Sequence, residues 1–337
     1  MIGGSPGASL ILDEGLIRED DSMTDTDTDG ATTVATMTEP LIRTTNLTQD
    51  YGSVLALDGL DIEIPPGITG LVGANGAGKT TLLKIVLGLL TPTLGTVSVL
   101  GSLVSENPIG IRERIGYMPE DRCLPLDQTA ADFVGYAAEL AGIPSSEARR
   151  RSSETLYLVG LHDERFRYIG DFSTGMQQRV KLAQAIVHDP ELVLLDEPAS
   201  GLDPKGREQM LDLITRFGEF GINVVISSHI LEDIEATCEW VVMLDGGKLI
   251  RSAPLEPPAE GDEVSVEVFG DPGPLIAALA KLGVQATVEG PIVRVTSDEG
   301  QAFECVRDAL AISESSVRRL GVSLSSLEDL FLEEAGG

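Results

Sequence analysis

The chain has 337 residues, a formal net charge of −30 at pH 7 and an isoelectric point near 4.3. This acidity disfavours an independent nucleic-acid binder or a protein that adheres directly to anionic lipid, because phosphate contacts need lysine and arginine. We attribute the charge to solubility or to a salty cell. The cysteines form no metal-binding or disulfide pattern, which favours a reducing cytosol. No apolar run reaches the ~18–20 residues of a membrane span, and the N-terminus lacks the basic flank of a signal peptide.

The length predicts two domains, or one large domain with an appendage. Residues 1–40 are acidic, with Arg18 as their one basic residue, and we expect them to be disordered because they bury too little apolar surface. An acidic interaction tail is the alternative. We expect a main domain over residues 41–256 and, from the linker Pro257-Pro258 onward, a small α+β accessory domain over residues 257–337.

Strands are predicted along the main domain from two kinds of pattern. Apolar and polar residues alternate in Leu41–Leu47 and Leu60–Ile64, as they do in half-buried strands. The runs Ile68–Val72, Leu192–Leu195 and Val224–Ser228 are apolar throughout or nearly so, as in the buried strands of a parallel sheet.

Helices are predicted between these strands. One begins near Leu82, and another opens at Phe172 and continues through Ile186. Residues 128–170 show helical spacing that indicates one helix around Ala130–Leu140 and a second around Ser153–Val159. In the last segment the expected elements are strand Val264–Phe269, helix Pro274–Leu282, strands Val284–Val288 and Ile292–Thr296, helix Gln301–Ile312, a further strand and a last helix with a capping box at Ser325–Glu328.

A glycine-rich turn, Gly73–Thr81, follows the strand Ile68–Val72 and leads into the helix predicted near Leu82. In such a turn successive backbone N–H groups surround a phosphate, and the positive end of the helix faces it. Lys79 is placed to reach the β- and γ-phosphates, and the Thr80 hydroxyl to hold Mg²⁺. The pattern GxxxxGK[ST] arises by chance in a chain of this size with a probability on the order of 1%. The turn therefore predicts a nucleoside triphosphate site.

Polar residues end two of the buried strands, Asp196-Glu197 in one case and His229 in the other. Together with the glycine-rich turn they predict a doubly wound α/β fold whose ligand lies at the carboxyl edge of the sheet. Taken singly, an acidic pair is often a solvated edge, and a histidine beside serines is often structural. Tyr51, near a turn upstream, is either an ordinary aromatic residue or a stacking platform for adenine.

The order of these features resembles the ATP-binding subunits of ATP-binding-cassette (ABC) transporters over about residues 41–255. The matching segments, in the family's terms, are the Walker A loop Gly73–Thr81, the Walker B strand with the catalytic glutamate Leu192–Glu197, the signature Phe172–Met176, the D-loop Ser200–Asp203, the switch histidine His229 and the adenine-stacking Tyr51.

Three positions depart from the family's usual pattern. Ala74 stands where proline is more usual, Glu120 replaces a glutamine, and Met176 replaces the glutamine that ends the signature. The last two changes, with the tail Ser326–Leu332, resemble the subgroup that serves multidrug, antibiotic or polysaccharide-type exporters. A carboxylate at Glu120 is expected either to contact Mg²⁺ or its water, or to repel the γ-phosphate.

The resemblance implies an α/β fold, namely a P-loop NTPase ABC cassette with a RecA-like core, an antiparallel β subdomain and a helical signature subdomain, followed by the small C-terminal α+β domain. It implies ATP as the nucleotide, bound by Tyr51, Gly73, Ala74, Asn75, Gly76, Ala77, Gly78, Lys79, Thr80, Thr81, Glu120, Asp196, Ser173, Gly175, Met176 and Asp203. It implies Mg²⁺ held by Thr80, Glu120 and Asp196. Glu197 would polarise the attacking water, and His229 would contact the γ-phosphate.

The resemblance also implies partners. Ser173 and Gly175 would meet the γ-phosphate of another protomer, and one chain has one Walker A loop and one signature, so a complete site needs a homodimer or a heterodimer with a similar subunit. The driven partner would be a separate multi-pass membrane permease, which places the protein peripherally on the cytoplasmic face of the cell membrane. We expect no nucleic-acid partner.

Two other functions are considered. Soluble ABC ATPases that act in translation or DNA maintenance usually carry paired cassettes, coiled-coil insertions or basic surfaces, and this chain has a single cassette and a net charge of −30. A regulatory module without turnover is disfavoured by the intact Glu197 and His229. The sequence therefore predicts an ATPase subunit that drives a permease, with export as the expected direction.

Overall fold

The computed structural model describes residues 39–121, 123–255, 263–289, 292–296, 302–313 and 315–322. The segment expected to be disordered, up to residue 38, the linker Pro257-Pro258 and the predicted last helix at Ser325–Glu328 lie outside the described residues. In the described part, no helix is long and apolar enough to cross a membrane.

A six-stranded sheet forms the centre of the first part of the chain. Its strands, in order across the sheet, are β10 (Lys248–Pro254), β9 (Trp240–Asp245), β3 (Ile68–Val72), β8 (Asn223–Ser228), β7 (Leu192–Asp196) and β6 (Ile115–Met118). All neighbours from β9 to β6 run parallel, and β10 is antiparallel to β9. Every residue of β3 and β7 is buried, which confirms that these apolar runs are strands covered on both faces.

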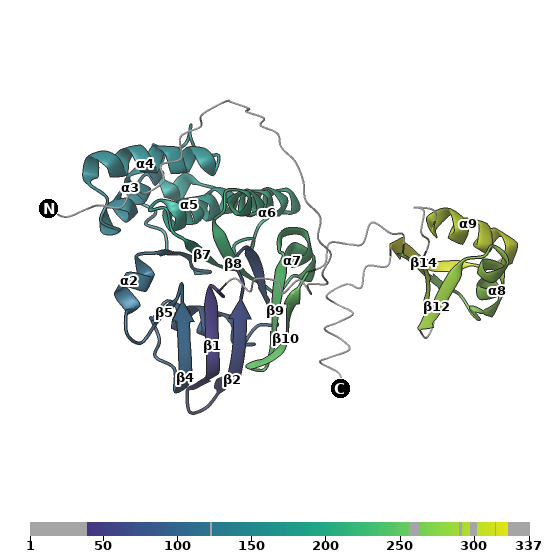
Figure 1. Ribbon diagram of the computed structural model, residues 1–337. Helices are drawn as coiled ribbons and strands as arrows, with labels where there is room; N and C mark the ends of the chain where they lie inside the picture. The colour runs from purple at the N-terminus through teal and green to yellow at the C-terminus, as the bar shows by residue number, and fades with distance from the viewer. Residues whose placement is uncertain are drawn as a thin grey trace, which may run out of the picture. The chain divides into compact units, whose positions relative to one another are not determined.

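The two faces of this sheet belong to different cores, because successive side chains of a strand point to opposite sides. Val193 and Leu195 of β7 belong to a core with α5 (Thr174–Ile186) and α6 (Pro204–Glu219). Leu192 and Leu194 belong to a core with α1 (Lys79–Val86). In Figure 1, α5 and α6 lie on one side of β7 and β8, and β1, β2 and β4 lie on the other.

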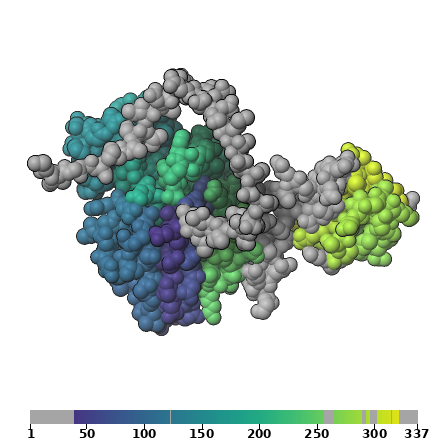
Figure 2. Space-filling view, viewed as in Figure 1, coloured from purple at the N-terminus to yellow at the C-terminus, as the bar shows by residue number. Residues whose placement is uncertain are grey.

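A second, antiparallel sheet packs against α1. Its strands are β2 (Leu55–Ile64), β1 (Ile42–Asp50), β4 (Leu94–Val99) and β5 (Ser102–Leu103), in that order. The predicted strands Leu41–Leu47 and Leu60–Ile64 fall within β1 and β2, and their alternation buries residues such as Ile42 and Ile62 against the helix. In Figure 2 these strands lie beside the β9–β10 hairpin, in agreement with the contact between β2 and β10.

Further helices and a 3-10 turn connect the strands of the large sheet. They are α2 (Pro108–Arg112), α3 (Ala130–Leu140), α4 (Ser145–Leu158), η1 (Ile169–Asp171) and α7 (Leu231–Thr237). The two helices expected within residues 128–170 are confirmed as α3 and α4. Gly142 and Gly160 adopt φ values of +91° and +74° at the ends of α3 and α4, where a left-handed residue stops a helix.

A third sheet is formed by the last part of the described chain. Its strand order is β12 (Gln285–Glu289), β13 (Ile292–Thr296), β11 (Glu263–Val268) and β14 (Val317–Val322), with helices α8 (Gly273–Lys281) and α9 (Ala302–Ser313). All pairings are antiparallel. The buried apolar residues of these elements form a core of their own, and the predicted order strand–helix–strand–strand–helix–strand matches the structure.

Gly116 of β6 provides a test of how tightly α5 packs on the sheet. A Cβ at this position would collide with the Ala185 carbonyl oxygen, which is backbone and cannot rotate away. We expect Gly116→Ala to lower the free energy of unfolding by about 1–3 kcal/mol, since overpacking forces strain or a backbone shift. Chemical denaturation of the full-length chain measures the change.

Gly135→Ala is the matched control. A Cβ at Gly135 of α3 has Ser152 Cβ as its nearest neighbour, at 3.9 Å, which is ordinary contact. Helix propensity then favours alanine by about 0.5–1 kcal/mol. Equal stabilities of the two variants would show that the packing of α5 on β6 is not as close as described.

Candidate functional site

The glycine-rich turn joins the C-terminal end of β3 to the N-terminus of α1. The helix begins at Lys79, three residues before the predicted start at Leu82, so the N–H groups of its first turn face the loop. Gly78 is the N-cap with φ +105°, and a Cβ there would approach the Ala56 carbonyl oxygen to 2.6 Å. Glycine is therefore required at this point. Ala74, Asn75 and Gly76 are exposed, which leaves the loop open to a ligand.

Lys79 places a buried positive charge beneath the loop. Its Nζ donates to the Gly73 carbonyl oxygen at 2.6 Å and to that of Ala74 at 3.4 Å. The same Nζ lies 3.6 Å from Glu197 Oε1, and both side chains are more than nine-tenths buried. Among the described residues, Glu197 Oε1 has no hydrogen-bond partner. The loop, the lysine and the glutamate thus meet around a polar position that an anion and a water molecule could occupy.

Asp196 is buried at the end of β7 and accepts hydrogen bonds from two hydroxyl groups. Thr80 Oγ1 of α1 donates to Oδ2 at 3.0 Å, and Ser227 Oγ of β8 donates to Oδ1 at 2.6 Å. Ser227 Oγ also accepts from the Glu197 N–H at 3.0 Å. These contacts hold the ends of β7, β8 and α1 together at one edge of the sheet.

The donor set at this position fits a magnesium ion. Mg²⁺ prefers oxygen ligands and is usually held by one or two protein groups, with water and substrate phosphates completing its coordination. Thr80 and Asp196 supply a hydroxyl and a carboxylate in direct contact. No cluster of three or more His, Cys, Asp or Glu side chains suited to a metal occurs in the described part of the chain.

Glu197 and His229 form the outer part of this group. His229 Nδ1 lies 2.9 Å from Glu197 Oε2, and the imidazole is about half exposed while the glutamate is buried. Glu197 has φ +49°, an uncommon conformation for a residue other than glycine. This turn at the strand end directs its side chain between Lys79 and His229. Backbone strain of this kind is characteristic of functional sites.

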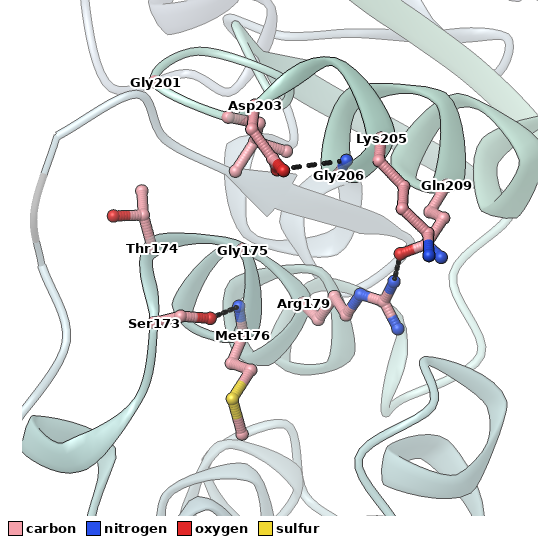
Figure 3. Close-up of a pocket in the computed structure, with 11 residues that line it drawn as sticks. Ser173, Thr174, Gly175, Met176, Arg179, Gly201, Asp203, Lys205, Gly206 and Gln209 are labelled. Atoms are coloured by element: carbon pink, nitrogen blue, oxygen red, sulfur yellow. Dashed lines mark hydrogen bonds between the residues drawn. The ribbon is translucent and has the colours of Figure 1, made fainter.

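A second group of predicted residues surrounds a pocket of about 520 Å³. It is lined by Ser173, Thr174, Gly175, Met176, Arg179, Gly201, Leu202, Asp203, Lys205, Gly206 and Gln209 (Figure 3). Ser173 caps α5 by accepting from Met176 N–H at 3.3 Å, and Asp203 caps α6 by accepting from Gly206 N–H at 3.1 Å. The signature and the D-loop therefore meet at two helix N-termini, and none of the residues Gly73–Thr81 lines this pocket.

Tyr51 and Glu120 lie outside the glycine-rich turn, and no described side-chain contact joins them to either group. Tyr51 lies on the turn between β1 and β2, with its ring about half exposed and its N–H bonded to the Val54 carbonyl oxygen at 3.0 Å. Glu120 is exposed on the loop after β6, where its main-chain carbonyl accepts from Lys181 Nζ. Adenine stacking by Tyr51 and a metal contact from Glu120 remain predictions.

Sequence reasoning did not assign Ser227 or Lys181 to the site. Ser227 orients both Asp196 and Glu197, and its position at a strand end beside His229 was the available signal. Lys181 is a charged residue among the mostly apolar buried residues of α5, which was a weaker signal. Its burial lowers the pKa of the ammonium from its ordinary value, while nearby acidic side chains act in the opposite direction.

A family model described as "ABC transporter" matches residues 57–200. The bacitracin transport ATP-binding protein of Bacillus licheniformis is 34% identical over 303 residues, which cover 88% of this chain and 98% of the relative. Its counterpart in Enterococcus faecalis is 31% identical, with 89% of this chain and 97% of the relative covered. The chain belongs to the ATP-binding subunits of ABC transporters.

Solved structures agree with this assignment. CbiO1 of Clostridium perfringens, described as part of an ABC transporter complex, is 26% identical with a TM-score of 0.60, covering 65% of this chain and 90% of that one. A dimeric bacterial ABC transporter cassette is 26% identical with a TM-score of 0.59, covering 64% and 99%. The predicted P-loop ABC cassette fold is confirmed, and this ABC subunit binds and hydrolyses ATP.

The position of Glu197 leads to a test of its role. We expect Glu197→Gln to retain ATP binding, because Lys79 and the loop are untouched, and to lower turnover by at least ~10²-fold, since the amide is a poor base for the attacking water. Calorimetric ATP titration and phosphate release by the full-length chain measure the two quantities.

Lys79→Ala is the matched control, because it removes the other member of the Lys79–Glu197 pair. This variant should lose ATP binding and turnover together. Turnover of Glu197→Gln equal to that of the unmodified chain would reject the assigned role of Glu197, and unchanged ATP affinity of Lys79→Ala would reject that of the loop.

Proposed function

We propose that this subunit couples ATP binding and hydrolysis to export by a separate multi-pass membrane permease, and that it does so as a dimer of cassettes. The observation that carries the proposal is the separation of the two groups of site residues. Lys79, Asp196 and Glu197 meet at the carboxyl edge of the sheet, whereas Ser173 and Asp203 line a pocket without any phosphate-loop residue. Each chain thus offers one loop and one signature surface.

ATP binding follows from the loop. The exposed backbone N–H groups of the turn and the first turn of α1 surround the phosphates, and Lys79 exchanges the Gly73 carbonyl oxygen for phosphate oxygens. Thr80 and Asp196 are the residues that would hold Mg²⁺, with Glu120 as the further predicted contact. The ion, when bound, neutralises charge on the β- and γ-phosphates.

Hydrolysis follows from the outer part of the site. Glu197 accepts a hydrogen bond from the attacking water, whose oxygen adds to the γ-phosphorus as the bond to the β-phosphate oxygen breaks. His229 holds Glu197 through the 2.9 Å contact and, being half exposed, lies where it can also meet the γ-phosphate. Positioning of this kind accounts for most of the rate acceleration in phosphoryl transfer, because the protein forms no covalent bond with the transferred group.

A second cassette would complete the site. Ser173 and Gly175 of one chain would meet the γ-phosphate bound by the other, and the open pocket in front of α5 and α6 provides the surface. One related cassette has been solved as a dimer, which supports this arrangement. We propose a homodimer or a heterodimer with a similar subunit.

The names of the relatives support the proposals of export and of a separate permease. Two of them are named as bacitracin transport ATP-binding proteins, and a third, from Bacillus subtilis, is a linearmycin resistance ATP-binding protein that is 30% identical over 62% of this chain and 68% of the relative. The described part of this chain has no helix that could cross a membrane, so the transport pathway would lie in another subunit. We propose that this subunit acts at the cytoplasmic face of the membrane. Action in translation or DNA maintenance is not favoured by these relatives.

Affinity purification of the tagged full-length chain from its own detergent-solubilised cells tests the permease. We expect a multi-pass membrane protein to be recovered in near-equal amount and to raise ATP turnover. The same purification with Lys79→Ala, which leaves the outer surfaces intact, should recover the same membrane protein. Recovery of ribosomes or nucleic acid instead, without any membrane protein, would favour the soluble alternative.

A further inference from the structure

Lys181 connects the signature helix to a loop on the neighbouring strand. It lies on α5, the helix that Ser173 caps, and its side chain is only 4% exposed. Its Nζ donates to three successive main-chain carbonyl oxygens of the loop after β6, those of Pro119 at 2.6 Å, Glu120 at 3.1 Å and Asp121 at 3.3 Å.

This arrangement fixes the shape of the loop. Three consecutive carbonyl groups converge on one point only when the chain turns around it, and an ammonium is the side-chain group that offers three donors to one point. No ion pair of Lys181 occurs among the described residues, so these carbonyl groups are its direct partners, while the carboxylates of Glu120, Asp121 and Asp196 act on the buried charge from a longer distance. Removal of the ammonium would leave the carbonyl groups without their donor.

The loop lies between the two groups of site residues. The loop follows β6, which pairs with β7, the strand that ends on Asp196; Met118 of β6 lies opposite Leu195 of β7. The helix that Lys181 contributes, α5, begins at the pocket lined by Ser173 and Asp203. A side chain that joins this loop to α5 therefore joins the nucleotide end of the sheet to the signature surface.

We propose that Lys181 is a positioning residue for ATP hydrolysis, because its ammonium holds the Glu120 loop against the signature helix and makes the two move as one unit. The inference rests on the proposed role of Glu120 near the nucleotide. Lys181 acts through the loop and not on the nucleotide. Its loss therefore lowers turnover, whereas ATP affinity is unchanged because Lys79 and the glycine-rich turn determine it.

The test compares Lys181→Met, Lys181→Arg and Lys248→Met in the full-length chain. Methionine keeps the length and apolar stem but removes the donors, arginine keeps the charge and donors, and Lys248 is an exposed lysine of β10. We expect Lys181→Met to lower kcat about tenfold or more, as misplacement of site groups does, with an ATP Kd within about twofold of the control. Lys181→Arg keeps the charge but presents a planar fork in place of a single ammonium, so it should recover only part of the loss.

Two results would overturn the proposal. One is a kcat of Lys181→Met equal to that of Lys248→Met, and the other is a parallel loss of kcat, ATP affinity and thermal stability, which is what a purely structural role produces. Should Lys181→Met fail to fold, Lys181→Gln is judged by the same criteria.

Glu120→Ala separates this inference from the function on which it rests, because alanine removes the metal contact that glutamine, the family's usual residue here, would keep. Unchanged kcat and Mg²⁺ requirement in Glu120→Ala would reject the proposed role of Glu120, whatever Lys181→Met does. If Glu120→Ala does alter kcat, the double variant Glu120→Ala/Lys181→Met should lose less than the product of the single losses, because both act through one loop. Fully multiplicative losses would overturn the connection between Lys181 and Glu120.

Discussion

The buried carboxylate of Asp196 organises the nucleotide end of this cassette. A carboxylate taken from water needs hydrogen-bond donors, and Asp196 finds them in Thr80 of α1 and Ser227 of β8. The two bonds fix a helix and two strands that are far apart in the sequence. Because Glu197 follows Asp196 directly and donates its own N–H to Ser227, the glutamate proposed as catalytic is positioned by the same contacts as the carboxylate proposed to hold Mg²⁺.

Much of this site could be predicted from the sequence, because its residues occur in short segments with characteristic patterns. A fully apolar run followed by acids indicated β7 and its edge, and the glycine-rich turn indicated the phosphate loop. The apolar spacing indicated α3 and α4 but did not locate their ends, which are set by the left-handed Gly142 and Gly160. Lys181 could not be predicted, because its three acceptors lie 60 to 62 residues away and only the fold brings them to α5.

The proposed ATP site is divided between two surfaces, so one chain alone would not complete it. The nucleotide end holds the glycine-rich loop and Lys79, and the signature pocket is lined by the N-termini of α5 and α6. Positive helix ends attract anions, so the pocket suits a γ-phosphate presented by another chain. The Lys181 contacts would then transmit the approach of a second chain to the first chain's own nucleotide end.

The claim that the signature surface serves another chain's nucleotide is tested most directly with Gly175→Asp. A Cβ at Gly175 meets only Leu202 Cδ2, at 3.8 Å, so it causes no clash in its own chain, and the added carboxylate would repel an approaching γ-phosphate. The account predicts that the full-length variant binds ATP with unchanged affinity and loses turnover. An ATP affinity weakened in proportion to turnover would place Gly175 in its own chain's nucleotide site and contradict the account.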